Sequence, residues 1–127
     1  MGLKILLADD SRPWLKLLAR ALAPYDYEIC SAASCEDAVR MSGLFRPDCL
    51  ILDFYLGDGT ALDVCARLKA DKDTRHTPVI ILSADPDVEE SAYGDCGAKK
   101  FLLKTESLSK IPEIVAGLVN ARREGAG

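Results

Sequence analysis

The chain is poor in histidine and has no excess of basic residues, and each shortage argues against a class of function. His76 is the only histidine among the 127 residues, so a catalytic Ser–His or Cys–His pair has little support. The 20 acidic residues outnumber the 16 basic ones, which gives a formal charge of −4. This balance argues against nucleic-acid binding by this domain alone.

Long hydrophobic runs are absent as well. No apolar run approaches the ~20 residues needed to span a bilayer. The N-terminal Met1-Gly2-Leu3-Lys4 leads directly into a strand-like segment and does not resemble a signal peptide. We therefore expect a cytoplasmic protein with no membrane partner. The length fits one domain, which we place at residues 1–122, with residues 123–127 as a flexible tail or the start of a linker.

The cysteines lack the spacing of a metal or redox motif. Their number, five, is odd, and no two of them form a C-x-x-C pair, which argues against zinc binding and thioredoxin-type chemistry. Several lie in apolar runs, so we expect small buried residues in a reducing compartment. The five are Cys30, Cys35, Cys49, Cys65 and Cys96.

What the chain does contain is a regular alternation of strand-like and helix-like segments. Strands are predicted at residues 3–8, 27–32, 48–53, 79–83 and 99–103. Residues suited to begin a helix follow four of them, namely Ser11, Ser34, Thr60 and Asp85. Near-continuous apolar strands alternating with helices are typical of a parallel sheet covered on both faces. The predicted fold is α/β, a doubly wound five-stranded parallel sheet with five helices.

Two helix boundaries are predicted from single residues. The helix after Ser34 is expected to end at Gly43, because glycine is common just past a helix end. The last helix is expected to begin at Ser107 or Ser109, because Pro112 would then fall in the first turn, where proline is tolerated.

Four of the apolar strands lead into polar side chains. These are Asp9-Asp10, Asp53, Ser83 and Lys104. Parallel strands present their carboxyl ends at one edge of the sheet, and ligands bind in the crevice there. We therefore expect the carboxylates, the hydroxyl and the ammonium to meet in one site.

The three carboxylates predict a magnesium site, since Mg²⁺ prefers hard oxygen ligands and keeps several waters. Asp9 and Asp10 would hold the metal, Asp10 more directly, together with Asp53 and the backbone carbonyl of Tyr55. Asp53 stands alone after the most apolar strand and is the candidate phosphoacceptor, because an aspartate can form a covalent phosphoenzyme.

Ser83 and Lys104 fit the same chemistry. A transferring phosphoryl group carries negative charge on its oxygens, and catalysis consists mainly of positioning and charge stabilisation. The Lys104 ammonium and the Ser83 hydroxyl would each bind one phosphoryl oxygen.

The sequence resembles the receiver domains of two-component response regulators over nearly its whole length. The resemblance rests on ILLADDS (residues 5–11), PDCLILD (47–53), VIILSA (79–84) and GAKKFLLK (97–104). It implies a flavodoxin-like fold with strand order 2-1-3-4-5 and Mg²⁺-dependent phosphotransfer to Asp53 from a sensor histidine kinase or a histidine phosphotransfer protein. Such a domain is not a classical enzyme and catalyses only its own phosphorylation and dephosphorylation.

The resemblance also implies a switch, in which Ser83 moves toward the phosphoryl group and the ring of Phe101 swings inward. The face formed by the fourth helix, fifth strand and fifth helix would then change its affinity for a downstream protein or a second copy of the chain. One departure from the family is Thr105, where a proline commonly follows the lysine.

Other interpretations stay open at this stage. One alternative is a receiver fragment of a longer transcriptional regulator with a DNA-binding output domain, and another is an interaction module of the same fold that is not phosphorylated. A haloacid-dehalogenase-type phosphohydrolase is a weaker alternative, because its D-x-D-G-T motif would need an aspartate at Tyr55.

Overall fold

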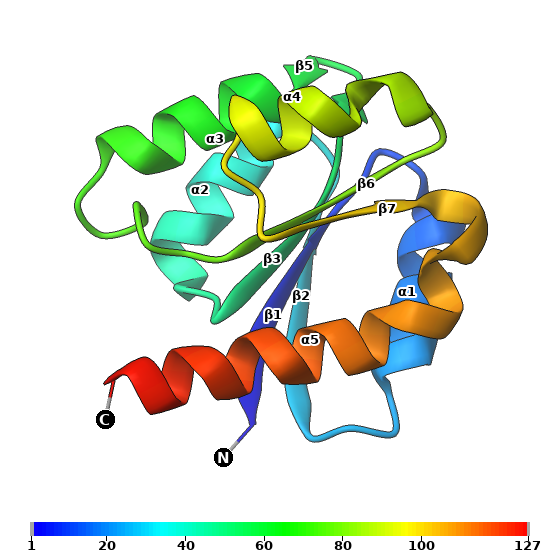
Figure 1. Ribbon diagram of the computed structural model, residues 1–127, viewed down its shortest axis with the longest axis vertical. Helices are drawn as coiled ribbons and strands as arrows, with labels where there is room; N and C mark the ends of the chain where they lie inside the picture. The colour runs from blue at the N-terminus through cyan, green and yellow to red at the C-terminus, as the bar shows by residue number, and fades with distance from the viewer. Residues whose placement is uncertain (1, 127) are drawn as a thin grey trace.

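The computed structural model describes residues 2–126 and the side chains as far as Ala121. Its centre is a five-stranded sheet in the order β2-β1-β3-β6-β7, with every neighbouring pair parallel (Figure 1). The strands are β1 (Leu3–Ala8), β2 (Tyr27–Ala32), β3 (Cys49–Asp53), β6 (Val79–Ser83) and β7 (Lys100–Leu103). The predicted fold class and strand order are therefore confirmed.

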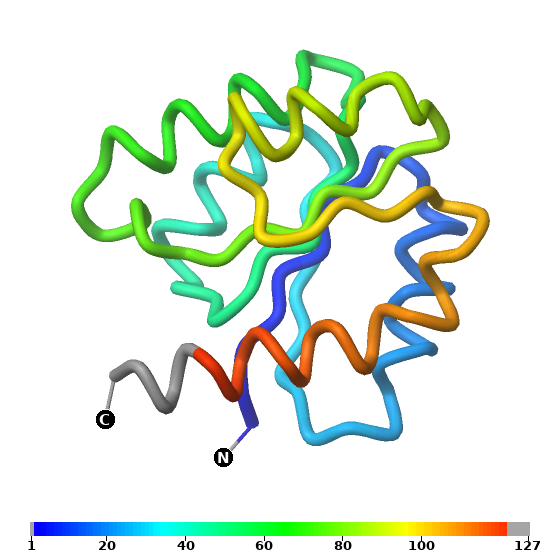
Figure 2. Tube along the Cα trace, in the orientation of Figure 1, coloured from blue at the N-terminus to red at the C-terminus, as the bar shows by residue number. Residues whose placement is uncertain are grey.

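Helices cover both faces of this sheet. α1 (Arg12–Leu22) and α5 (Lys104–Ala126) contact each other on one face. α2 (Cys35–Phe45), α3 (Ala61–Ala70) and α4 (Glu89–Gly94), which follows a short 3₁₀ turn η1 (Pro86–Val88), cover the other. The sheet is twisted, so that β6 and β7 cross the view at an angle to β1 and β2 (Figure 2).

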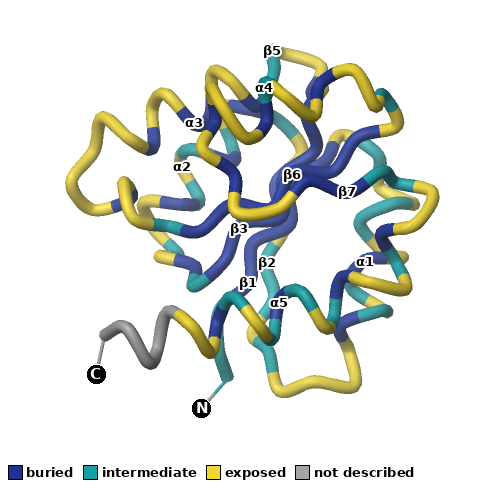
Figure 3. Tube along the Cα trace, viewed as in Figure 1, coloured by how far each residue is buried: buried dark blue, intermediate teal, exposed yellow. Residues whose placement is uncertain are grey.

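The core consists of two apolar layers, one on each side of the sheet. Leu6, Leu50 and Leu52 pack toward α2 and α3, whereas Ile5 and Ile51 pack toward α1 and α5. Figure 3 accordingly shows the central strands buried and the outer helix surfaces exposed. Burial of β3 on both faces fixes the position of its last residue, Asp53, at the edge of the sheet.

The predicted helix starts are confirmed for three helices. The hydroxyl of Ser11 accepts a hydrogen bond from the Trp14 N–H, and that of Ser34 accepts from the Asp37 N–H. Thr60 and Asp63 form a reciprocal capping box at the start of α3.

Two helix boundaries were predicted wrongly. α2 continues through Gly43 to Phe45 and ends where Arg46 adopts a left-handed φ of 55° before Pro47. α5 begins at Lys104 instead of Ser107 or Ser109, so Pro112 lies inside the helix. The Ser107 and Ser109 hydroxyls donate to carbonyls three residues earlier, at Lys104 and Glu106, and do not act as caps.

The backbone of residues 123–126 continues α5, and the domain boundary at residue 122 stays a prediction. The strands of a further hairpin, β4 (Tyr55–Leu56) and β5 (Gly59–Thr60), were not predicted. Among the helices that the structure describes, none combines the length and the apolar character needed to cross a membrane.

Candidate functional site

The predicted site residues lie at the carboxyl edge of the sheet. Asp9 directly follows β1, Asp53 and Ser83 end β3 and β6, and Lys104 follows β7. The register brings these ends side by side, since Ala8 pairs with Leu52, Asp53 with Leu82, and Ser83 with Leu103. Four strands that are far apart in the sequence therefore deliver their polar residues to one place.

Three carboxylates form a cluster at this edge. Asp9, Asp10 and Asp53 each offer an oxygen within 4.8 Å of the others. Asp9 and Asp53 are buried, whereas Asp10 is exposed. This arrangement presents oxygen ligands from the protein on one side and leaves access for water on the other, as Mg²⁺ sites require.

Lys104 is the cation that the structure places in this cluster. Its Nζ lies 2.8 Å from Asp9 Oδ2 and 3.3 Å from Asp53 Oδ2. The same ammonium lies 5.2 Å from the ring centroid of Trp14, which adds a cation–π contact. With three carboxylates and one ammonium, the cluster keeps an excess of negative charge that favours a divalent cation.

The hydrogen bonding of Asp9 supports the same conclusion. Its Oδ1 accepts a hydrogen bond from the Ser11 N–H at 2.9 Å. Its Oδ2 is buried and accepts no well-directed hydrogen bond, although it is ion-paired with Lys104. That ion pair compensates one of the three carboxylates, and the other two leave negative charge for a hard cation with oxygen ligands. The residues present therefore fit a magnesium ion.

Burial and charge also set the titration of the site. Burial raises the pKa of Asp53 to about 6, and repulsion from Asp9 adds to this effect, while Lys104 and the Tyr55 N–H oppose it. Burial also acts to lower the pKa of Lys104, but its contacts with Asp9 and Asp53 outweigh burial and the pKa rises. Lys104 thus stays charged beside a carboxylate whose negative charge is poorly compensated.

Ser83 and Phe101 occupy buried positions near this cluster. The Ser83 hydroxyl accepts a hydrogen bond from the Asp85 N–H at 3.0 Å, which leaves its own proton available for donation. Phe101 is buried in the layer facing α3 and α4, and its N–H donates to the Tyr93 hydroxyl at 3.0 Å. The switch roles of Ser83 and Phe101, and the Tyr55 carbonyl as a metal ligand, stay predictions.

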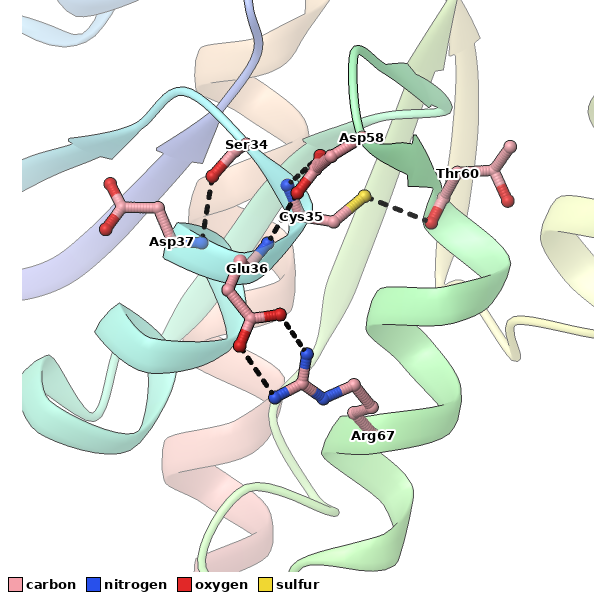
Figure 4. A network of polar contacts seen from close by, with 7 residues as sticks. All are labelled: Ser34, Cys35, Glu36, Asp37, Asp58, Thr60 and Arg67. Carbon is pink, nitrogen blue, oxygen red and sulfur yellow. Dashed lines mark hydrogen bonds and ion pairs between the residues drawn. The ribbon is translucent and has the colours of Figure 1, made fainter.

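The segment after Asp53 is held in place by contacts that the sequence did not reveal. Asp58 accepts hydrogen bonds from the N–H groups of Cys35 and Glu36, at 2.7 and 3.1 Å, and so caps α2 from a distance (Figure 4). Glu36 in turn pairs with both terminal nitrogens of Arg67 on α3. The hairpin that carries Tyr55 is thereby tied to α2, and α2 is tied to α3.

A second contact spans two loops at this edge. The Tyr55 hydroxyl donates to Asp85 Oδ2 at 2.9 Å and so joins the loop after β3 to the loop after β6. Sequence reasoning assigned Asp85 only to a helix start. Neither this contact nor the approach of Trp14 to Lys104 carries a signal in the sequence, because both depend on the packing of distant segments.

The family model and the curated relatives that match this chain point to one family. The model of the response regulator receiver domain matches residues 5–116. Response regulator MprA of Mycobacterium ulcerans is 32% identical over 112 residues, which cover 87% of this chain and 47% of that protein. Response regulator PleD of Caulobacter vibrioides is 32% identical over 105 residues, covering 82% of this chain and 23% of PleD. The chain thus spans half or less of these relatives.

A solved structure gives the same fold. The receiver domain of the sensor histidine kinase PA1611 from Pseudomonas aeruginosa superposes with a TM-score of 0.82 at 21% identity, covering 94% of this chain and 99% of that one. That crystal structure has a magnesium ion coordinated in its active-site cleft.

Proposed function

Because the chain belongs to the response regulator receiver family, we propose that it is a phosphorylation-dependent switch whose phosphoacceptor is Asp53. The family match over residues 5–116 argues against the phosphohydrolase alternative. The observation that carries the proposal is the cluster of Asp9, Asp10 and Asp53 around the Lys104 ammonium. Receiver domains in general act with histidine kinases, so the expected donor is a phosphohistidine on a kinase or a phosphotransfer protein.

The positions of Asp53 and Lys104 suit the transfer of a phosphoryl group to Asp53. An oxygen of the Asp53 carboxylate attacks the phosphorus of the phosphohistidine, and the new O–P bond forms as the P–N bond breaks. The imidazole leaves with the electron pair of that bond. Lys104, 3.3 Å from Asp53, offsets the charge that gathers on the phosphoryl oxygens.

The magnesium site would be formed by Asp9, Asp10, Asp53 and the Tyr55 carbonyl. When bound, Mg²⁺ supplies additional neutralisation of the phosphoryl charge. The fit rests on the oxygen donor set and on the excess of the three carboxylates over the Lys104 ammonium.

The output surface we propose is the face of α4, β7 and α5. A pocket on this face is lined by residues of all three elements, including Tyr93, Phe101 and Ile114. Ser83 and Phe101 lie on β6 and β7, between the acidic cluster and this face. A phosphoryl group that binds the Ser83 hydroxyl would therefore shift the packing around Phe101, and with it the affinity for a downstream protein or a second copy.

The organisation of the whole protein belongs to the same proposal. Residues 1–122 would form the receiver, and the following residues would lead into a tail or a linker. The relatives are longer than this chain. An output domain, including one that binds DNA, is therefore the alternative arrangement, and sequencing the complete gene tests it. The expected compartment is the cytoplasm, where histidine kinases present their phosphohistidine.

Intact-mass analysis after incubation with acetyl phosphate and Mg²⁺ tests the proposal. We expect the wild type to gain one phosphoryl group and Asp53→Asn to gain none. Asp73→Asn is a matched control, because Asp73 is exposed and pairs only loosely with Arg46, at 3.5 Å. Equal labelling of Asp53→Asn and the wild type would refute the assignment, and an unlabelled wild type would favour the non-phosphorylated interaction module.

A further inference from the structure

One aromatic ring lies beside the acidic cluster. Trp14, in the first turn of α1, has its ring centroid 5.2 Å from Lys104 Nζ, within the range of a cation–π contact. The two residues are remote in sequence, but α1 and α5 contact each other on one face of the sheet (Figure 1). The ring therefore contacts the cation of the site and contributes no oxygen ligand of its own.

The position of this ring is fixed by the segment that carries Asp9. The Ser11 N–H donates to Asp9 Oδ1 at 2.9 Å, and the Trp14 N–H donates to the Ser11 hydroxyl at 3.3 Å. Pro13 restricts the backbone of the same turn. The indole is half-buried and packs against the apolar layer on the α1 and α5 side of the sheet. Trp14 and the carboxylate of Asp9 thus belong to one rigid turn.

The indole N–H has no evident structural task. Nε1 is buried and finds no hydrogen-bond acceptor in the part of the chain that the structure describes. A buried donor without a partner lowers stability, so apolar packing and the Lys104 contact, not a hydrogen bond, keep the ring in place. Replacing Trp14 by phenylalanine therefore removes no hydrogen bond and retains an aromatic face.

The contacts of the Lys104 ammonium respond differently to the proposed reaction. Asp9 and Asp53 bind it at 2.8 and 3.3 Å, and these are carboxylates that would also bind Mg²⁺. A divalent cation at these oxygens competes with the ammonium for them and repels it. The face of the Trp14 ring attracts the ammonium through its quadrupole, and this attraction does not depend on the carboxylates.

Lys104 needs such a restraint because lysine is a compact charge on a flexible four-carbon stem. Its side chain is 21% exposed, so water offers the ammonium an alternative environment. The backbone at this position is fixed, since the Ser107 hydroxyl donates to the Lys104 carbonyl at 3.1 Å. That contact does not direct the side chain, whereas an aromatic face beside Nζ does.

We propose that Trp14 is a positioning residue, whose ring keeps the Lys104 ammonium at the acidic cluster while Mg²⁺ and the phosphoryl group occupy the carboxylate oxygens. This inference rests on the proposed role of Asp53 as phosphoacceptor. In this role the ring acts on the transfer only through Lys104. A partly desolvated cation–π contact corresponds to a change of about fivefold in rate if it is retained in the transition state.

The rate of labelling by acetyl phosphate at saturating Mg²⁺ tests this role. Trp14→Leu keeps an apolar side chain without a ring and should be labelled about fivefold more slowly than the wild type. Trp14→Phe keeps an aromatic face of weaker attraction, and its rate should lie between the two. In Lys104→Ala, which is itself slow, adding Trp14→Leu should cause no further loss, because the ring then has no ammonium to position.

Two outcomes of these rate measurements would overturn the proposal. The first is a rate of Trp14→Leu equal to that of the wild type. The second is the same loss on adding Trp14→Leu in the presence and in the absence of Lys104, because the ring would then act by packing alone.

Phe45 provides a matched control. Its ring makes the same kind of contact with Lys4 Nζ, at 5.5 Å from the ring centroid. Lys4 lies near the start of β1, at the end of the strand opposite to Asp9. Phe45→Leu removes a ring and a cation–π contact and should leave the labelling rate unchanged. Slowing as large as that of Trp14→Leu would indicate a general effect of ring loss and would contradict the proposal.

The fluorescence of Trp14, the only tryptophan, tests the contact without phosphorylation. In the metal-free protein, Lys104→Met should shift the emission, because a charge beside the indole is removed. Lys110→Met, at an exposed lysine of α5 that pairs with Glu106, should not. The difference between the wild type and Lys104→Met should persist after addition of Mg²⁺.

The fluorescence result separates this proposal from the proposed function. Identical emission of the wild type and Lys104→Met in Mg²⁺ would show that the ammonium leaves the ring, and would refute the positioning role of Trp14. A wild type that acetyl phosphate does not label would refute the proposed function instead, and the spectra would still decide whether the ring keeps the ammonium in place.

Discussion

Replacing Asp53 by asparagine should make the metal-free protein more stable at neutral pH, although it removes the proposed phosphoacceptor. The buried Asp53 carboxylate lies beside Asp9, and its pKa is raised from 3.8 to about 6. Asparagine has nearly the same shape and no charge. Lys104 keeps its ion pair with Asp9 at 2.8 Å in the variant, so no buried cation is left unpaired.

The size of the effect follows from the pKa shift. A rise of roughly two units corresponds to about 3 kcal/mol at ~1.4 kcal/mol per unit. Because the folded-state pKa is above the unfolded value, the wild type is not penalised below about pH 4 and loses this free energy as the pH rises to about 6. The side chain is only 9% exposed, so solvent screening reduces the value little. The advantage of Asp53→Asn should therefore be near zero at pH 4 and about 3 kcal/mol above pH 7.

Urea unfolding between pH 4 and 8 in the presence of EDTA measures this difference. Asp73→Asn, an exposed carboxylate far from the site, should show no such growth in stability with pH. Addition of millimolar Mg²⁺ should then stabilise the wild type and leave Asp53→Asn almost unchanged, because the ion binds the folded carboxylates. The account is refuted if Asp53→Asn is no more stable than the wild type at pH 7.5 without metal.

Three further predictions test the site and the fold. Lys104→Ala should still fold and be labelled by acetyl phosphate. In a pull-down, its binding to the downstream partner should be equal with and without the phosphodonor. A phosphodonor-dependent change in the binding of that variant would contradict the role of Lys104. Thr60→Ala should destabilise the protein by about 1 kcal/mol in urea unfolding, since it removes the capping box of α3, and an unchanged midpoint would show that the box contributes nothing. Leu52→Ala, in the fully buried strand β3, should lower the free energy of unfolding by about 2–5 kcal/mol. Leu44→Ala, at a residue that is 70% exposed, should change it very little. Similar losses in both variants would contradict the assigned core.

The sequence predicted that these side chains cluster, because the direction of parallel strands is a strong constraint. Once 3–8, 49–52, 79–82 and 100–103 are recognised as buried parallel strands, their carboxyl ends must share an edge. Asp9, Asp10, Asp53 and Lys104 then meet without any knowledge of loop geometry. The confirmed caps at Ser11, Ser34 and Thr60 have the same origin, since each depends on a few neighbouring residues.

The failures concern features that local sequence does not determine. The start of α5 was misplaced because proline was assumed to require a first turn, whereas packing of Ile111 and Val115 against the sheet holds the helix together around Pro112. The cap of α2 by Asp58 joins two segments that are remote in sequence.

The most direct test of the central claim identifies the residue that receives the phosphoryl group. The protein is phosphorylated with acetyl phosphate and Mg²⁺, treated with borohydride, which reduces an acyl phosphate to an alcohol, and mapped by peptide mass spectrometry. The account predicts homoserine at position 53 and an unmodified Asp9, Asp10 and Ser83. Homoserine at position 9 or 10, or an acid-stable phosphoester at Ser83, would contradict it.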